Sequence, residues 1–187
     1  MDTFEGGRSD FSSENRKTQR WHPGVAYLSV LHVLGEGFVD IKSAFNYSPK
    51  TPGYPAAAGE LLMARINPRI PRICVVPDLG VETLCSSEFV IMKVREPLDA
   101  YTLAYLLQTD IVQSQIRSLT SGTSASHNRI RTSDLSLVLI PIPRSDSNKA
   151  GLVDTIASEY REALKNLAKS TMKLAGIRSQ DVDVFPG

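Results

Sequence analysis

The sequence predicts an α+β protein: a twisted, β-rich domain with short helices, followed by one long C-terminal helix. Short β-branched and aromatic runs, separated by glycine and proline, fill positions 25–94, which is typical of strands and turns. Helical spacing of apolar residues appears at 98–118 and again from about 150 to 174. We therefore expect a flexible leader at 1–21, one domain at 22–145, the long helix at 146–176 and a frayed tail at 177–187.

The composition is that of a soluble globular protein and excludes several classes. Of the 187 residues, 42% are hydrophobic and 22% are charged. The net charge of +1 provides no global field for nucleic acid, so such a function must depend on local clusters. Cys74 and Cys85 are too few for a disulfide framework or a Cys-only zinc site, and we expect them to be buried and free. Without a signal-like or membrane-spanning run, a cytoplasmic protein with no membrane contact is expected.

The β-rich part begins with two apolar runs, Val25–Leu31 and Gly37–Ile41, which predict a strand, a turn around Gly35-Glu36-Gly37, and a second strand. Residues 48–59 contain three prolines and two glycines and indicate a loop. Strands are then expected at 60–66, 72–76 and 88–94. The connection at 67–71 holds two prolines, which remove backbone donors and restrict the preceding residues, so this loop should be stiff.

Two short helices and one further strand follow. Asp99 is a suitable N-cap for the first helix, and Asp110 for a second helix that turns Ile111, Val112 and Ile116 inward. The uninterrupted apolar run at 135–142 predicts a strand that is buried on both faces.

The C-terminal helix has an apolar seam at alternating three- and four-residue spacing, which approximates a coiled coil. A helix with so short a seam has only marginal stability in isolation. It therefore needs a partner in this chain or in another, and we expect self-association. The residues expected to pair are Val153, Ile156, Tyr160, Leu164 and Leu167.

No enzyme motif is visible, and we expect no cofactor, no metal and no catalysis. His22, His32 and His127 lie far apart and outside any metal-ligand pattern. The sequence has no GxSxG element and no phosphate-binding loop, and Gly35-Glu36-Gly37 does not extend to GxGxxG.

Two polar segments instead carry the residue types that contact DNA: a stiff one at 65–72 and a flexible one at 118–131. Arginine can be bidentate to guanine and asparagine to adenine, while hydroxyls and backbone amides contact phosphate. Ordinary solvated surface loops have similar compositions, so this pattern alone is only suggestive. The candidate DNA contacts are Arg65, Asn67, Arg69, Arg72, Ser121, Thr123, His127, Asn128, Arg129 and Arg131, with Lys42 and His32 extending the same surface.

The order of the segments resembles the target recognition domain of type I restriction-modification specificity (S) subunits. The matching pieces run from Val25 to Pro143: VAYLSVLHVLGEGFVDI, PAAAGELLMARINP, SSEFVIMKV, LDAYTLAYLLQTDIVQSQIRSLTSGTSASHNRI and LSLVLIPIP. Gly59-Glu60 stands where Gly-Asp is usual in that family. The C-terminal helix resembles the spacer helix that follows each recognition domain, but a full S subunit carries two domains and two long spacer helices.

The resemblance implies a non-catalytic specificity subunit that reads one half of a bipartite site in double-stranded DNA. It implies methyltransferase (M) subunits as partners, with restriction (R) subunits possible in addition, for an adenine-specific complex. Two alternatives stay open: a protein–protein interaction or assembly module derived from such a domain, or the recognition portion of a larger DNA methyltransferase.

Overall fold

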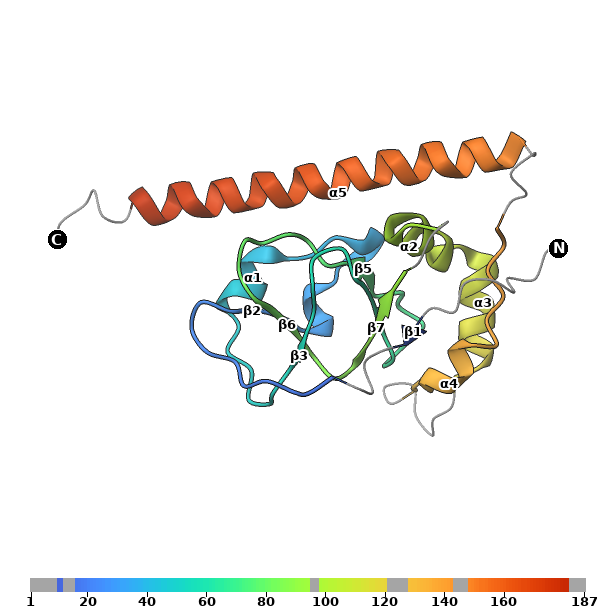
Figure 1. Ribbon diagram of the computed structural model, residues 1–187, viewed down its shortest axis with the longest axis horizontal. Coiled ribbons are helices and arrows are strands. Elements are labelled where there is room, and N and C mark those ends of the chain that lie inside the picture. Colours follow the sequence, from blue (N-terminus) through green and yellow to red (C-terminus); the bar gives the residue numbers. More distant parts are fainter. Residues whose placement is uncertain (1–9, 12–15, 95–97, 121–127, 143–147, 182–187) are drawn as a thin grey trace.

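The fold is built on two small sheets that pack against each other, and it is described from a computed structural model that covers residues 10–11, 16–94, 98–120, 128–142 and 148–181. The larger sheet is antiparallel, in the order β1-β7-β4-β5, and the smaller has the order β2-β6-β3, with β2 parallel and β3 antiparallel to β6 (Figure 1). The strands are β1 (Asp10–Phe11), β2 (Ala26–Leu28), β3 (Tyr54–Pro55), β4 (Leu61–Ala64), β5 (Ile73–Val75), β6 (Thr83–Cys85) and β7 (Phe89–Lys93).

The larger sheet is covered on both faces, which explains why its strands are apolar without interruption. In β4, Leu61 and Met63 point to one face, while Leu62 and Ala64 point to the other. The first face packs against helices α2 (Ala100–Gln108) and α3 (Asp110–Ser118). The second face packs against the smaller sheet, so one strand contributes to both halves of the core.

Helix α2 begins as the sequence predicts, because the Asp99 carboxylate accepts hydrogen bonds from the backbone N–H groups of Tyr101 and Thr102. The prediction for α3 was partly wrong. Thr109 rather than Asp110 is its N-cap, and Ile111 is 61% exposed, while Val112 and Ile116 are buried as expected.

The first apolar runs form less strand than expected. After β2 the chain makes the 3-10 turns η2 (Val30–His32) and η3 (Gly35–Gly37). An isolated antiparallel bridge joins Val33, which follows the first run, to Val39 of the second. The second run then enters helix α1 (Ile41–Asn46), because the Asp40 side chain accepts a hydrogen bond from the Ser43 N–H and caps it.

The apolar run at 135–142 is not a strand, which corrects the prediction of a strand buried on both faces. The short helix α4 (Thr132–Leu135) occupies its start, and Leu137 and Leu139 are both more than half exposed. The backbone groups of Leu139 bond to the Gln115 side chain, which donates to the carbonyl and accepts from the N–H, both at 2.9 Å. A side-chain amide thus takes the place of a neighbouring strand.

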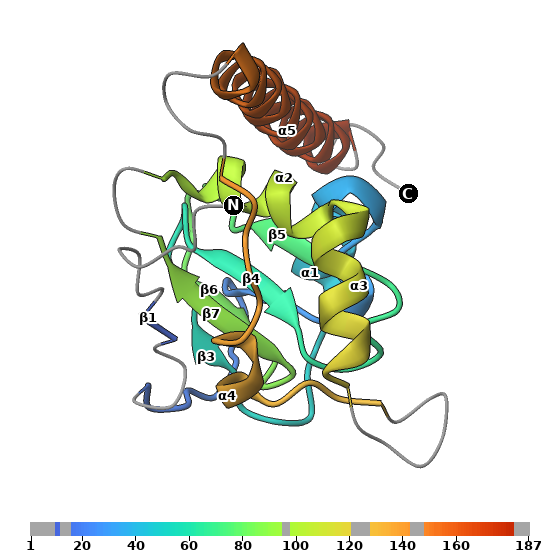
Figure 2. The same ribbon diagram turned by 90° about the vertical axis from the view of Figure 1, so that its right-hand side faces the viewer.

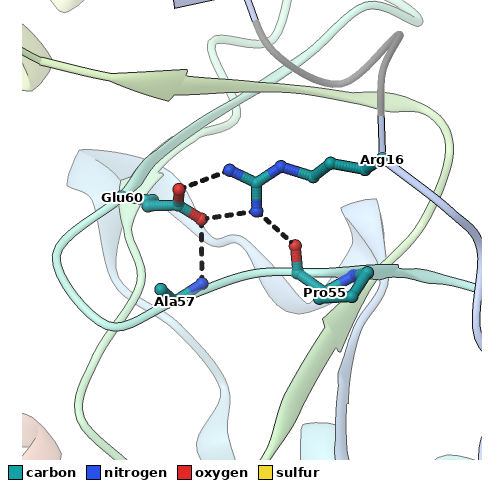
Figure 3. A network of polar contacts seen from close by, with 4 residues as sticks. All are labelled: Arg16, Pro55, Ala57 and Glu60. Carbon is teal, nitrogen blue, oxygen red and sulfur yellow. Dashed lines mark hydrogen bonds and ion pairs between the residues drawn. The ribbon is translucent and has the colours of Figure 1, made fainter.

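The leader is attached to the domain in its described part, where the sequence predicted a flexible segment. β1 pairs with the outer edge of β7, and Gln19 exchanges two backbone hydrogen bonds with Gly53. Figure 3 shows the Arg16 guanidinium between the Glu60 carboxylate and the Pro55 carbonyl, and Glu60 also accepts from the Ala57 N–H. The Gly-Glu pair that precedes β4 therefore serves as an anchor for the leader.

The long helix α5 (Asn148–Asp181) runs along one side of the domain, past α2 and α1 (Figure 1). Ala157 is buried, and Ala168 and Met172 pack against the buried Ala26 and Ile41. Further contacts come from the Tyr160 hydroxyl, which donates to the Glu36 carbonyl, and from Arg161, which is 2.8 Å from Asp99. The predicted α+β class with one long C-terminal helix is confirmed.

Candidate nucleic-acid interface

The two polar segments singled out by the sequence meet in space, although some sixty residues separate them. The Asn67 N–H donates to the Asn128 carbonyl at 2.9 Å, and the Ile130 N–H donates to the Arg65 carbonyl at 3.0 Å. These two bonds frame an isolated antiparallel bridge between Ile66 and Arg129. The junction lies where the ladder between β4 and β7 ends at its last pair, so the larger sheet supports both segments.

The first segment forms a tight turn at Asn67, where the prolines predict a stiff loop. Asn67 has φ 49°, a left-handed conformation that asparagine tolerates better than most residues, and its carbonyl accepts from the Ile70 N–H at 3.0 Å. Pro68 is buried beneath this turn, whereas Arg69 is exposed and Arg72 is half-buried. The turn thus displays cationic side chains from a backbone that has little freedom to lose on binding.

A third element, the Ser86–Glu88 turn, lies beside the junction, and its role was missed by the sequence reasoning. The Glu88 carbonyl accepts from the Arg65 N–H at 2.8 Å, and the Ser87 carbonyl accepts from the Arg65 guanidinium. The Glu88 carboxylate forms an ion pair with Arg129 at 2.8 Å. A sequence signal did exist, because Glu88 is the one acidic residue within the segment SSEFVIMKV, but nothing local pairs it with Arg129.

Three of the buried polar atoms that lack a hydrogen-bond partner lie at this junction: Arg65 Nε, Asn67 Oδ1 and Glu88 Oε2. Unpaired buried polar groups are uncommon and costly in native proteins. All three belong to residues of the two joined segments or of the turn beside them.

Only some of the remaining predicted DNA contacts lie near the junction of the two segments. Arg131 is exposed and Asn128 is half-buried beside the junction, while Ser121, Thr123 and His127 lie outside the described residues. Lys42 is exposed on α1, which packs against α5. By contrast α4, which directly follows the second segment, lies on the opposite side of the domain from α5 (Figures 1 and 2). Lys42 therefore does not extend the surface formed by the joined segments.

His32 is also not a surface group, which corrects its assignment as a candidate contact. The side chain is 7% exposed, its Nδ1 lies 3.0 Å from the Tyr27 carbonyl, and its ring meets Tyr47 edge to face. Burial lowers the pKa of His32, which keeps the ring neutral near neutral pH. The residue completes the local cap of a 3-10 turn with Ser29.

Of the residues expected to pair between helices, Tyr160 is committed to its own domain. Its hydroxyl donates to the Glu36 carbonyl at 2.7 Å and accepts from Gln108 Nε2 at 3.1 Å. Val153, Ile156 and Leu164 are half-buried, and Leu167 is 43% exposed. Together with Leu152 and Leu174, which are each more than half exposed, they leave apolar surface on α5.

Neither a metal centre nor a membrane span is found among the residues that the structure describes. No group of three or more His, Cys, Asp or Glu side chains there could hold a metal ion. No described helix combines the length and apolar character needed to cross a membrane. Cys74 and Cys85 are free and buried, as expected, and burial raises the pKa of Cys85 to about 12, so neither thiol is poised as a nucleophile.

Comparison with known proteins shows the fold. No family model matches the sequence, and no curated protein does. Among solved structures, the chain is similar to the HsdS subunit from Thermoanaerobacter tengcongensis, with a TM-score of 0.55 and 20% identity over 98% of this chain and 48% of that one. It is also similar to a chain from a structure described as the basis of complex assembly and conformational transition of the type I R-M (restriction-modification) system, with a TM-score of 0.54 and 19% identity over the same shares.

The protein therefore has the fold of one recognition domain and its trailing helix. More particularly, this is the fold of type I specificity subunits, and it confirms at the level of structure the resemblance carried by the sequence motifs. The chain spans about half the length of the solved chains it matches.

Proposed function

We propose that this protein is a non-catalytic specificity subunit that recognises a sequence in double-stranded DNA and directs an adenine methyltransferase or restriction complex to it. The observation that carries the proposal is the backbone junction between the two polar segments, through Asn67 with Asn128 and Arg65 with Ile130. It gathers arginine and asparagine side chains from distant parts of the chain on one end of a rigid sheet. These are the residue types that read guanine and adenine in the major groove.

The charge distribution suits a local rather than a global attraction. With a net charge of +1, the protein has no long-range field toward DNA, so affinity depends on the arginines at the junction. Each phosphate neutralised by such a group contributes about −0.9 to the slope of log K against log salt concentration. If about four arginines contact phosphate, that slope is roughly −3 to −4.

The partners follow from the same reasoning. The HsdS-like fold and the apolar side chains left exposed on α5 support contact with M subunits. R subunits would then join the complex of this chain with the M subunits. The chain spans about half of the HsdS subunit it resembles, and in a self-associated form each copy would read one half of a bipartite site. Self-association through α5 is part of this proposal.

The test is to co-express the chain with its methyltransferase and to map methylated adenines across the host DNA. A discrete methylated motif is expected, and Arg129→Ala should abolish or alter it. Lys42→Ala removes the same charge from helix α1, which packs against α5, and should leave the motif unchanged. Binding of the purified protein to a duplex with that motif should weaken steeply with salt.

The rival function predicts a different pattern. A protein–protein interaction module would yield no methylated DNA motif. Its affinity for duplex DNA would be weak, and neither Arg129→Ala nor Lys42→Ala would change it. A motif that persists unchanged in Arg129→Ala and Arg65→Ala would contradict the assignment of the junction as the DNA-reading surface.

A further inference from the structure

The Ser86–Glu88 turn is held independently of the two segments that it touches. Its Ser86 carbonyl accepts from the Phe89 N–H at 3.0 Å, and its Ser86 hydroxyl accepts from the Glu88 N–H at 3.2 Å. The Ser86 N–H donates to the Leu28 carbonyl of β2. The turn also connects β6 of the smaller sheet to β7 of the larger one, so both sheets fix its position.

This turn contacts one arginine from each of the joined segments. The carbonyls of Ser87 and Glu88 accept from the guanidinium and the backbone N–H of Arg65. The Glu88 carboxylate accepts from Arg129 Nη2 through Oε1 at 2.8 Å. A single rigid element therefore sets the orientation of side chains that belong to sequence positions 65 and 129.

A carboxylate at a DNA-binding surface needs a reason, because it repels phosphate. Stability does not supply one, since ion pairs this exposed contribute little to folding. The geometry does: the Arg129 side chain is 56% exposed and the Glu88 side chain is 27% exposed, so the arginine is the more accessible partner of the pair and the glutamate the more buried one. The ion pair uses Nη2, whereas a guanidinium carries five N–H donors in a fixed plane.

We propose that Glu88 is a positioning residue that holds Arg129 in the orientation needed to read a guanine, a step that rests on the proposed DNA-binding function. An arginine held by this ion pair presents its remaining donors in a defined plane, which suits the O6 and N7 acceptors of guanine. Arg131 is exposed and its side chain is not held by the Ser86–Glu88 turn, so its part is a phosphate contact. Glu88 itself touches no base.

The experiment compares Glu88→Gln, Arg129→Ala and Arg131→Ala with the unchanged protein on the duplex identified by methylation mapping. Fluorescence anisotropy gives the affinity for that duplex and for duplexes altered at one base pair each. Glu88→Gln should reduce discrimination at a single G·C pair by roughly 5- to 150-fold, the value of one bidentate base contact. Affinity for unrelated duplex DNA should stay the same or rise, because a negative charge has been removed from the surface.

Two further measurements separate positioning from a general structural effect. Replacing the guanine of that pair with 7-deazaguanine, which lacks the N7 acceptor, should weaken binding of the unchanged protein but not of Arg129→Ala. Arg131→Ala should weaken binding to all duplexes alike, and Glu159→Gln, which removes an exposed carboxylate on α5, should change nothing. If Glu88→Gln fails to fold, Glu88→Asp keeps the charge, and it should lower discrimination without raising affinity for unrelated DNA.

The inference is overturned if a folded Glu88 variant keeps full discrimination at every base pair, or if it loses affinity equally for all sequences. A protein that shows no sequence preference before any substitution would overturn the proposed function itself, and this inference with it. A protein with a clear motif and a silent Glu88 would leave the proposed function intact and remove only the positioning role.

Discussion

The contact between Gly37 and Tyr160 predicts how strongly the long helix is fixed to the domain. Gly37 has φ +75°, and a Cβ at this position would lie 2.1 Å from the Tyr160 hydroxyl and 2.9 Å from the Ile73 carbonyl oxygen. Gly37→Ala therefore costs about 1–2 kcal/mol of backbone strain. It also displaces a hydroxyl that bonds to Glu36 and Gln108, at about 0.5–1.5 kcal/mol for each bond. The expected loss in free energy of unfolding is about 2–5 kcal/mol.

The assay is urea unfolding followed by circular dichroism, together with hydrogen exchange of the α5 amides. Tyr160→Phe removes the hydroxyl and provides the matched partner for a double-mutant cycle. In the Tyr160→Phe background, Gly37→Ala should cost less than it does alone, because the closest contact has been removed. Strictly additive losses, or a Gly37→Ala protein of unchanged stability, would refute this account of how α5 is held.

Three further contacts give testable outcomes. Burial raises the pKa of Asp99, but hydrogen bonds from its helix and the ion pair with Arg161 outweigh it and lower that pKa. The ionised Asp99 therefore stabilises the fold above its unfolded-state pKa, and this stabilisation is lost as the pH falls through its folded-state pKa. In Asp99→Asn, the free energy of unfolding in urea should thus fall less steeply as the pH is lowered. Glu60→Gln should cost about 1–3 kcal/mol in urea and expose the leader to protease, because Arg16 loses its carboxylate; unchanged digestion would contradict this. Gln115→Ala should speed exchange of the Leu139 amide, because that amide donates its hydrogen bond to the Gln115 side chain; unchanged protection would count against this.

Several elements were predictable because their signals are local. The apolar strands at 60–66, 72–76 and 88–94 correspond to β4, β5 and β7, whose burial on both faces matches their uninterrupted hydrophobicity. The cap at Asp99 was predictable for the same reason, since a side chain bonds there to backbone two and three residues away.

The apolar run at 135–142 shows where such reasoning fails. Its hydrophobicity predicts a strand, but a strand also needs a neighbour with free backbone groups. Leu139 finds the Gln115 side chain instead, 24 residues earlier in the chain. A pattern within one segment carries no information about which distant group will satisfy its hydrogen bonds.

The sequence by itself determined the chemistry of the candidate interface: two acid-free segments with arginine and asparagine, one of them stiffened by proline. Only the tertiary structure decided that the two segments join and that Glu88 pairs with Arg129. It also decided that Lys42 and His32 take no part in the joined surface. Composition and local conformation act over a few residues, whereas the junction depends on the pairing of β4 with β7, which brings residues 65 and 88 side by side.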